Sequence, residues 1–327
     1  VFLLFIASLT MFMSGLVANF EYDLKKIIAL STLSQLGLMI SILALGESML
    51  AFFHLLMHAL FKALLFMCAG CMIHNFSNCQ DIRYMGSMVN FTPLTSVFFN
   101  LCNLALCGLP FLSGFYSKDL ILEFMSMNYM NLYVYIIFYL STGLTVMYSV
   151  RLVYYTMFGE YNGYSYFSIY DSSDEMLKGM GGLIFFVIFS GSVIGWLVFP
   201  TPYFICLPLL MKLMIIFIVI MGVVLGYMLS VIGFNDYSKT MEFYSLSFFF
   251  TSMWNLNLLS TFGVVYYFLV FGEKFNFYID QGWSEYYGSQ NLYLKMKATS
   301  LFLQNFFFNN IKIFLTLFLI WICILFI

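Results

Sequence analysis

The chain has 327 residues, of which 63% are hydrophobic and only 9% are charged, and its formal net charge is -2. A soluble domain carries about 25% charged residues, so this composition excludes an ordinary water-soluble protein and predicts an all-α, polytopic membrane helix bundle. The small net charge also excludes nucleic acid as a partner, because no basic patch is available to contact phosphates.

Apolar runs separated by short polar stretches predict a series of membrane-spanning helices that face the lipid bilayer. The second run carries Ser31, Thr32, Ser34 and Gln35 in its first half, and small and polar residues of this kind favour contact with other helices over contact with lipid. The chain begins at Val1 within an apolar run, which is typical of a piece of a longer protein and not of a signal peptide. The predicted spans are residues 1–20, 27–45, 49–73, 91–123, 132–158, 183–199 and 209–233.

The third predicted span holds His54, His58 and Lys62 at four-residue spacing. Four residues advance a helix by about 400°, so these three side chains share one face. Ionisable groups at membrane depth are costly and mark ion or proton paths. The alternative is structural: each histidine would cap a carbonyl group of a neighbouring helix, and Lys62 would extend to the membrane interface. Three such groups on one face favour a proton path.

The fourth predicted span is too long for one simple crossing and is interrupted between Gly108 and Gly114, with Pro110 in the middle. Proline removes a backbone donor and glycine permits an unwound segment. Unwound backbone is tolerated at membrane depth only where it faces protein or water, and transporters use such broken helices as ion sites. We therefore predict a broken helix at this point.

Lys118 and Asp119 follow the break directly, so Lys118 is predicted to lie deep in the membrane near the start of the second half-helix. A lysine in that place is a candidate for taking up and releasing a proton. Asp119 is adjacent in sequence, points in another direction on a helix and need not be the ion partner of Lys118. The alternative is an interfacial Lys118–Asp119 pair on a surface turn, which the apolar residues on either side disfavour.

Basic residues are distributed unequally between the two sides of the predicted bundle. When the sides alternate along the chain, one side has only Lys212 near it. Cytoplasmic or matrix loops carry the excess of basic residues, so the richer side is predicted to be the inner one. That side holds Lys25, Lys26, Arg83, Arg151, Lys178 and Lys239.

Residues 240–308 combine an uncharged stretch, 243–272, with charged residues such as Glu273, Lys274 and Asp280 after it. Hydropathy alone would allow 243–272 to span the membrane. The many hydroxyl and amide side chains within it favour a long lateral amphipathic helix on the inner face instead. Residues 309–327 are predicted to form a final anchoring span.

The sequence offers no evident metal or cofactor site. Its seven cysteines are odd in number and lie mostly in apolar runs, so they do not indicate a disulfide framework. Cys68 and Cys71 have the spacing of a redox pair, but we predict that they pack inside a membrane helix. His54 and His58 cannot provide opposite axial ligands to one haem, and no nearby group completes a zinc set. We predict that the chain binds no cofactor and no metal.

Three motifs give the chain its resemblance to a known family. They are DLKKIIALSTLSQLG from Asp23, the HxxxHAxFKA pattern from His54, and GLPFLSGFYSKD from Gly108. Together they resemble the chain 5 family of mitochondrial NADH–ubiquinone oxidoreductase (respiratory complex I), in its arthropod members. That family is related to subunits of the multi-subunit cation/proton antiporters.

The resemblance implies a proton-translocating membrane-arm subunit of the mitochondrial inner membrane, with the richer side of the bundle in the matrix. NAD, flavin, iron–sulfur clusters and ubiquinone would be bound by other subunits. The resemblance assigns residues 1–158 to the second of two inverted antiporter-like five-helix repeats and 159–239 to additional transmembrane helices. It makes 240–308 a lateral helix along other membrane-arm subunits and 309–327 the C-terminal anchor. The first repeat lies outside this chain.

The resemblance also implies residue roles. The family's lysine at the position of Lys118 is central to the outward half of the proton path, and the positions of His54, His58 and Lys62 form the polar axis that leads to it. Lys25 and Lys26 match a basic pair with a structural or gating role, to which we add Asp119. A stand-alone or multi-subunit cation/proton antiporter would use the same axis without the lateral helix, and stays as the alternative.

Overall fold

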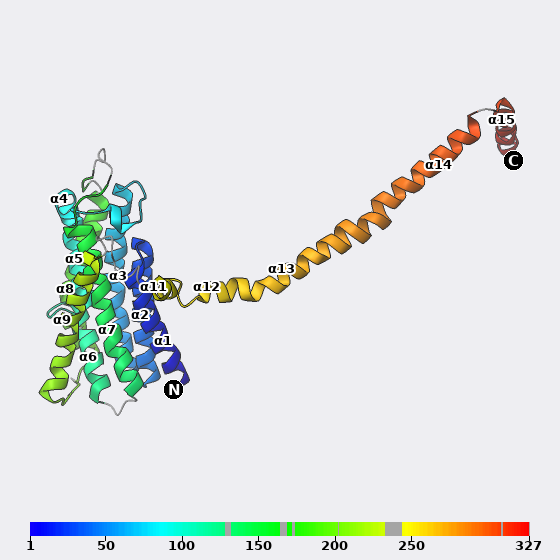
Figure 1. Ribbon diagram of the computed structural model, residues 1–327. Helices are drawn as coiled ribbons and strands as arrows, with labels where there is room; N and C mark the ends of the chain where they lie inside the picture. Colours follow the sequence, from blue (N-terminus) through cyan, green and yellow to red (C-terminus); the bar gives the residue numbers. More distant parts are fainter. Residues whose placement is uncertain are drawn as a thin grey trace. The chain divides into compact units, whose positions relative to one another are not determined.

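The computed structural model describes residues 1–127, 132–163, 169–171, 174–201, 203–232, 244–308 and 310–326. Within these ranges the ordered elements are helices, and no strand is formed. Contacts divide the chain into two compact units, Val1–Trp254 and Asn255–Ile327, and each unit is described here by itself (Figure 1). The predicted all-α membrane class is confirmed.

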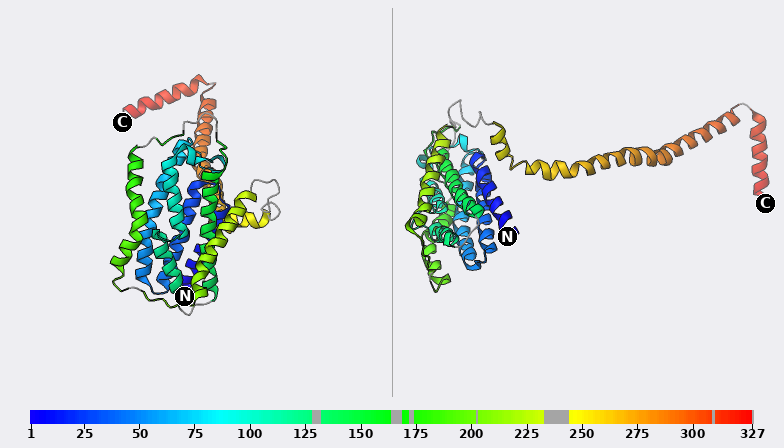
Figure 2. Two further views of the ribbon diagram at one scale, coloured as in Figure 1. Left: turned by 90° about the vertical axis from the view of Figure 1, so that its left-hand side faces the viewer. Right: turned by 60° about the horizontal axis from the view of Figure 1, so that its bottom comes forward.

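The first unit is a bundle of long helices that lie side by side (Figures 1 and 2). Most of them are long and apolar enough to cross a bilayer, while α5 and α6 are shorter and follow one another. The main helices of the bundle are α1 (Phe2–Phe20), α2 (Leu24–Ala44), α3 (Ser48–Asn75), α5 (Pro93–Cys107), α6 (Ser113–Met127), α7 (Leu132–Val153), α8 (Asp174–Val198) and α9 (Leu209–Ile232). Two further elements, η1 (Ile82–Tyr84) and α4 (Met88–Phe91), are short, and the π-helical turn η2 (Tyr154–Phe158) continues α7.

Apolar side chains fill the interior of the bundle and also cover its outside. Phe53, Phe99 and Phe138 are fully buried, whereas Phe185 and Phe189 on α8 are well exposed. An exposed apolar face of this extent would favour aggregation in water, but it matches the hydrocarbon core of a bilayer. The outer surface of the bundle is therefore suited to lipid.

The interruption between α5 and α6 has a clear local cause. Gly108 ends α5 with a φ of 83°, a left-handed conformation that glycine adopts without strain. The chain then passes Pro110, and α6 begins at Ser113. At the start of α6, Gly114 lies so close to α5 that a Cβ atom there would be 1.8 Å from the carbonyl oxygen of Ala105. The two half-helices thus meet backbone to backbone.

Loops from three parts of the chain gather at one end of the bundle. Asp23 forms an isolated β-bridge with Asp81, and Arg83 forms an ion pair of 2.6 Å with Asp81. The guanidinium carbons of Arg83 and Arg151 lie 4.4 and 4.5 Å from the ring centre of Tyr22. Arg151 is only 5% exposed and donates hydrogen bonds to the carbonyl groups that end α1. Its count among the free basic residues of the loops was therefore wrong.

The other basic residues of the charge analysis lie near helix ends. Lys25 and Lys26 are in the exposed first turn of α2, and Lys178 is exposed near the start of α8. Lys212 is in the first turn of α9, at the end of the bundle opposite to Lys25 and Lys26. The loop before α9 lies at that end, because the hydroxyl of its Tyr203 donates a hydrogen bond to Glu47, between α2 and α3. Lys239 lies outside the described residues.

The Asp81–Arg83 pair predicts a pH-dependent contribution to stability. Burial raises the pKa of the Asp81 carboxyl, but hydrogen bonds from Arg83 outweigh it, so the net pKa lies below the ordinary value of 3.8. A lowered folded-state pKa adds stability at pH values above the unfolded-state pKa, and this is lost as pH falls through the folded-state value. We expect Asp81→Asn to lower the unfolding temperature near neutral pH by about 1–2 °C and the difference to shrink as the pH falls below the ordinary carboxyl value of 3.8 and through the lowered folded-state pKa. Thermal unfolding of both proteins in detergent measures this difference in unfolding temperature. A difference that persists at low pH would contradict a stabilising role of the Asp81–Arg83 pair.

Two predicted boundaries differ from the structure. Helix α8 begins at Asp174, nine residues before the apolar run at 183, because its first turns are polar and escape a hydropathy argument. The helix predicted from 240 is not continuous either. The short helix α11 (Tyr244–Thr251) packs on α1, with the rings of Phe20 and Phe250 stacked at 6.1 Å. A turn follows, in which Met253, Trp254 and Asn255 have positive φ values.

The second unit contains one unbroken helical run, Leu256–Phe307, of 52 residues. At about 1.5 Å per residue it is about 78 Å long, more than twice the roughly 30 Å of a bilayer core, so it is no simple crossing. The run comprises α12 (Leu256–Leu258), η3 (Leu259–Gly263), α13 (Val264–Phe275), η4 (Asn276–Ser284), η5 (Tyr286–Gln290) and α14 (Asn291–Phe307).

Polar residues of this long helix recur at seven- and four-residue spacing. They are Glu273, Asp280, Ser284, Asn291 and Lys295. The last helix, α15 (Ile311–Leu325), has 15 residues, fewer than the about 20 of a usual span. An anchoring role for residues 309–327 therefore stays a prediction.

Candidate functional site

Helix α3 carries three ionisable side chains into the interior of the bundle. His54, His58 and Lys62 are 1%, 8% and 4% exposed. Each step of four residues keeps them on the face that packs against other helices, as the spacing requires. Lys62 does not extend to the membrane interface, because its ammonium group donates a buried hydrogen bond to the hydroxyl of Ser31 on α2.

His54 joins α3 to two other helices. Its Nδ1 lies 2.9 Å from Oγ of Ser117 on α6, and its Nε2 lies 3.3 Å from Oε1 of Gln35 on α2. A doubly protonated ring would donate to both oxygens, whereas a neutral ring with its hydrogen on Nε2 would accept from Ser117. Both partners are side chains rather than the backbone carbonyls of the structural alternative, so this imidazole is held where a proton can enter at one nitrogen and leave at the other.

His58 lies between the two better-connected groups of α3. Its ring centre is 6.3 Å from that of His54. The Nε2 atom of His58 is buried, and within the described residues it has no hydrogen-bond partner. The shared face therefore does not make a continuous hydrogen-bonded stripe along α3.

Lys118 lies one residue after Ser117 and is 4% exposed. Its ammonium group donates to Oγ1 of Thr145 on α7 at 2.8 Å and to the carbonyl oxygen of Leu106 at 3.4 Å. Leu106 is in the last turn of α5, where carbonyl groups lack helical partners and the helix dipole is negative. The break between α5 and α6 thus provides an acceptor for a buried cation.

Asp119 is partly buried and forms no ion pair with Lys118. The ion pairs among the described residues are Asp23–Lys26 and Asp81–Arg83, and both lie in the loops at one end of the bundle. Asp119 lies near the break, since its Oδ1 atom would be 3.5 Å from a Cβ atom placed on Gly108. Lys118 is therefore a buried lysine whose hydrogen-bond acceptors are a hydroxyl and a carbonyl group.

The structure brings four of the seven predicted site residues into one interior row. We use the term polar row for Lys62, His58, His54, Ser117, Lys118 and Thr145, which cross from α3 through α6 to α7. Asp119 flanks the row. Lys25 and Lys26 stay outside it, because both are exposed and Lys26 pairs with Asp23 at 2.7 Å. Only N–H and O–H bonds would have to change for a proton to move along the row.

Sequence reasoning missed the hydroxyl groups that hold the row together. Ser117 was visible only as part of a motif, and Thr145 was not singled out. A signal was present on α7, where buried hydroxyl residues recur at helical spacing and mark a polar face. These residues are Ser141, Thr142, Thr145, Tyr148 and Ser149.

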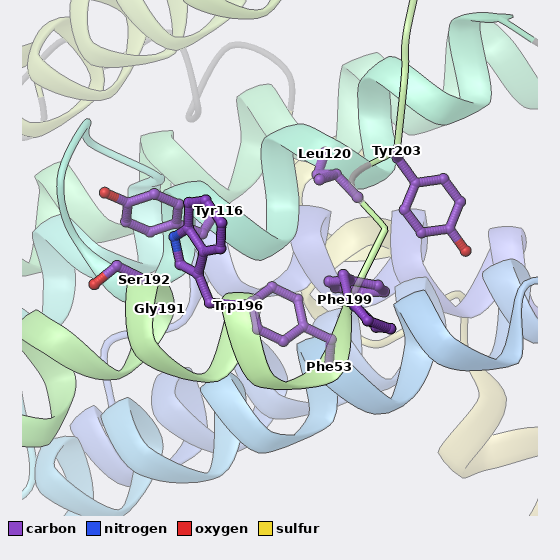
Figure 3. Close-up of a pocket in the computed structure, with 10 residues that line it drawn as sticks. Phe53, Tyr116, Leu120, Gly191, Ser192, Trp196, Phe199 and Tyr203 are labelled. Carbon is purple, nitrogen blue, oxygen red and sulfur yellow. The ribbon is translucent and has the colours of Figure 1, made fainter.

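A cavity of about 300 Å³ between α3, α6 and α8 lies beside the row but is not part of it. Figure 3 shows the ring of Phe53 on its wall, near Trp196 and Phe199. Phe53 is next to His54 in sequence and therefore points to a different face of α3. The cavity is aromatic and apolar, and the polar row does not line it.

Comparison with known proteins places this geometry in a family. A family model described as "NADH dehydrogenase subunit 5 C-terminus" matches residues 148–327. A second, described as "NADH:quinone oxidoreductase/Mrp antiporter, TM", matches residues 1–145 and so includes the whole polar row. A solved structure, "Structure of Mrp complex from Dietzia sp. DQ12-45-1b", has a TM-score of 0.55 over 70% of this chain and 26% of that chain. At 22% identity, it shows similarity of fold alone.

Curated relatives cover the chain from end to end. NADH-ubiquinone oxidoreductase chain 5 of Anopheles gambiae is 53% identical over 99% of this chain, and that of Locusta migratoria is 51% identical over 100%. The matched region is 56% and 57% of these relatives, so the chain spans about half of their length. By these matches, this chain belongs to the NADH-ubiquinone oxidoreductase chain 5 family.

Proposed function

We propose that the chain is a proton-translocating membrane-arm subunit of NADH–ubiquinone oxidoreductase in the mitochondrial inner membrane. The observation that carries the proposal is the polar row, in which two lysines and two histidines are buried in the interior of the bundle and form no ion pair with any carboxylate among the described residues. Such groups are costly to bury and mark proton paths. The test is proton uptake by sealed vesicles whose assembled complex carries Lys118→Ala, during NADH oxidation by a quinone. Normal uptake would overturn the proposal.

The mechanism that follows is electrostatic. In a low-dielectric interior, charges a few ångströms apart interact strongly, so a proton that arrives at one group changes the proton affinity of the next. Lys62 is hydrogen-bonded to Ser31 and Lys118 to Thr145, and His54 is hydrogen-bonded to Ser117, the residue before Lys118. Quinone reduction elsewhere in the complex would change the charge at one end of the arm. NAD, flavin, iron–sulfur clusters and ubiquinone would stay on other subunits.

The proposal extends to the second unit and to orientation. The long helix Leu256–Phe307 would lie along the membrane and contact other membrane-arm subunits, and its length supports this better than a crossing. Residues 1–158 would form the second inverted repeat. The loops with Lys25, Lys26, Arg83, Lys178 and Lys239 would face the matrix.

Loss of His54 is expected to be milder than loss of Lys118. In His54→Ala, water can fill part of the space and bridge Ser117 to Gln35, so we expect proton pumping to fall by about threefold to tenfold without vanishing. Pumping per NADH oxidised, measured in sealed vesicles at a matched amount of assembled complex, gives the ratio. Complete loss in this variant would show that His54, and not Lys118, is the dominant group.

A cation/proton antiporter subunit is the second candidate, favoured by the match of residues 1–145 to a family model that includes Mrp antiporters. The polar row would serve both functions. The two are separated by imposing a sodium gradient on sealed vesicles in the absence of NADH. Proton movement driven by sodium alone, and lost in Lys118→Ala, would favour the antiporter.

A further inference from the structure

The aromatic cavity beside the polar row opens on the side of the bundle that suits lipid. Its volume is about 300 Å³, and Figure 3 shows the side chains of α3, α6 and α8 that surround it. Trp196 of this lining is 85% exposed, and Phe189 and Val193 before it on α8 are 60% and 56% exposed. Because Trp196 belongs to both, the cavity is continuous with the exposed apolar face of α8.

Two glycines one helical turn apart on α8 leave this space open. A Cβ atom on Gly191 would lie 2.8 Å from the Cα atom of Ser113, so α8 touches the start of α6 at this level. On Gly195, a Cβ atom would lie 3.7 Å from Cζ of Phe53, which is an ordinary contact distance. Both glycines line the cavity, and since glycine has no side chain, α8 does not fill the gap that remains.

The cavity offers an occupant little hydrogen bonding. The hydroxyl of Ser192 already donates to the carbonyl oxygen of Phe189 at 2.9 Å, and the hydroxyl of Tyr203 donates to Glu47 at 3.0 Å. An ordered water needs about two to four polar partners, so a cavity of this kind is not filled by water. Its volume is about twice the ~150 Å³ of an apolar cavity that holds benzene. The occupant that fits is therefore an apolar chain or ring.

One end of the cavity carries a negative charge. Tyr203 lines this end, and its hydroxyl donates to the carboxylate of Glu47 in the turn between α2 and α3. A carboxylate can accept further hydrogen bonds and attracts a cation more than an anion. A phospholipid with an amine headgroup matches both features, because it has an apolar chain for the cavity and an ammonium group for Glu47. A free fatty acid would instead place a second carboxylate there.

We propose that this cavity is the seat of one acyl chain of a phosphatidylethanolamine, whose ammonium headgroup lies at Glu47. The chain contacts Phe53 and Tyr116, which directly precede His54 and Ser117 in the sequence. The hydrogen bond of 2.9 Å between His54 and Ser117 joins α3 to α6 within the polar row. The bound lipid thus completes the packing of α3, α6 and α8 next to this bond.

The test is photolabelling of the assembled complex in phosphatidylcholine vesicles that contain phosphatidylethanolamine with a diazirine in its acyl chain. Mass spectrometry of the peptides identifies the labelled residues. We expect a label on Leu120, on the α6 wall of the cavity. Phe185 on α8 is 65% exposed and does not line the cavity, so its label measures general contact with lipid. Added unlabelled phosphatidylethanolamine should lower the Leu120 label relative to that of Phe185, and added phosphatidylglycerol should leave this ratio unchanged.

Three variants locate the site. Gly195→Leu fills the cavity from α8 without a backbone clash, so the Leu120 label should be lost. Gly182→Leu is the matched control on the same helix, because a Cβ atom there meets nothing within 4 Å, and it should keep the label. Glu47→Gln removes the negative charge and should abolish the difference between the two competing lipids.

The competition uses the unaltered complex, so its result does not depend on the folding of any variant. A ratio that no added lipid changes would overturn the site. Stronger competition by phosphatidylglycerol would overturn the amine headgroup and would point to Lys212, in the first turn of α9, as the group that recruits an anionic lipid. Competition by a long-chain quinone alone would assign the cavity to a different ligand. Labelling requires no electron transfer, so these results are independent of the proposed function.

Discussion

Replacing Lys118 with alanine is expected to lower the rate of proton pumping by about 10²-fold or more, because the polar row loses its last proton-binding group. The ammonium group sits where α5 ends and α7 presents Thr145, so no other basic side chain can take its place among the described residues. The quinone reductase rate should fall with it, since electron transfer and pumping are coupled in the proposed mechanism. Fluorescence quenching of a pH-sensitive dye in sealed vesicles measures the first quantity, and NADH oxidation measures the second.

Two further variants show whether titration or mere positive charge is needed at this position. Lys118→Arg keeps a cation that cannot release its proton in a protein, so pumping should be lost here as well. Lys178→Ala removes an exposed lysine near the start of α8 and should leave pumping intact. Full pumping by Lys118→Arg would mean that the site needs a fixed charge, and proton transfer through Lys118 would be wrong.

Gly114→Ala is expected to prevent accumulation of the assembled protein. A Cβ atom on Gly114 would lie 1.8 Å from the carbonyl oxygen of Ala105, which is backbone and cannot rotate away. Overpacking of a core costs about 1–3 kcal/mol when side chains can adjust, so a backbone clash should cost at least the upper end of this range. The clash would separate α6 from α5 and move Lys118 away from Leu106. The amount of assembled complex on native gels, and its unfolding temperature, measure the effect.

Gly70→Ala is the matched control for this prediction. Gly70 lies within α3, and a Cβ atom there meets nothing within 4 Å. Alanine is the better helix former by about 1 kcal/mol, so this change should be neutral or slightly stabilising. Equal loss of assembly in both variants would show that the protein tolerates no change at helical glycines, and the close contact at Gly114 would not be its cause.

Features that depend on local sequence could be predicted without the structure. The membrane class, the limits of most spans and the common face of His54, His58 and Lys62 follow from hydropathy and from the 3.6-residue repeat of a helix. The break near Gly108 follows from the backbone chemistry of glycine and proline. Each is a property of residues near one another in the chain.

Boundaries that depend on contacts with distant residues were predicted less well. Arg151 was counted as a loop charge, yet it is buried against the carbonyl groups that end α1, more than a hundred residues earlier in the chain. The turn at Met253–Asn255 interrupts a stretch that hydropathy treats as continuous, because α11 packs on α1. Tertiary contacts set these limits.

By itself, the sequence determined which helices exist and which of them carry charge into the membrane, since periodicity and hydropathy act along a single helix. Only the tertiary structure decided what those charges touch: Ser31 and Gln35 from α2, Ser117 from α6, and Thr145 from α7. These residues are ordinary hydroxyl and amide side chains in apolar runs. Their part in the site arises because helix packing brings segments far apart in the chain within hydrogen-bond reach, and no local pattern records which helices become neighbours.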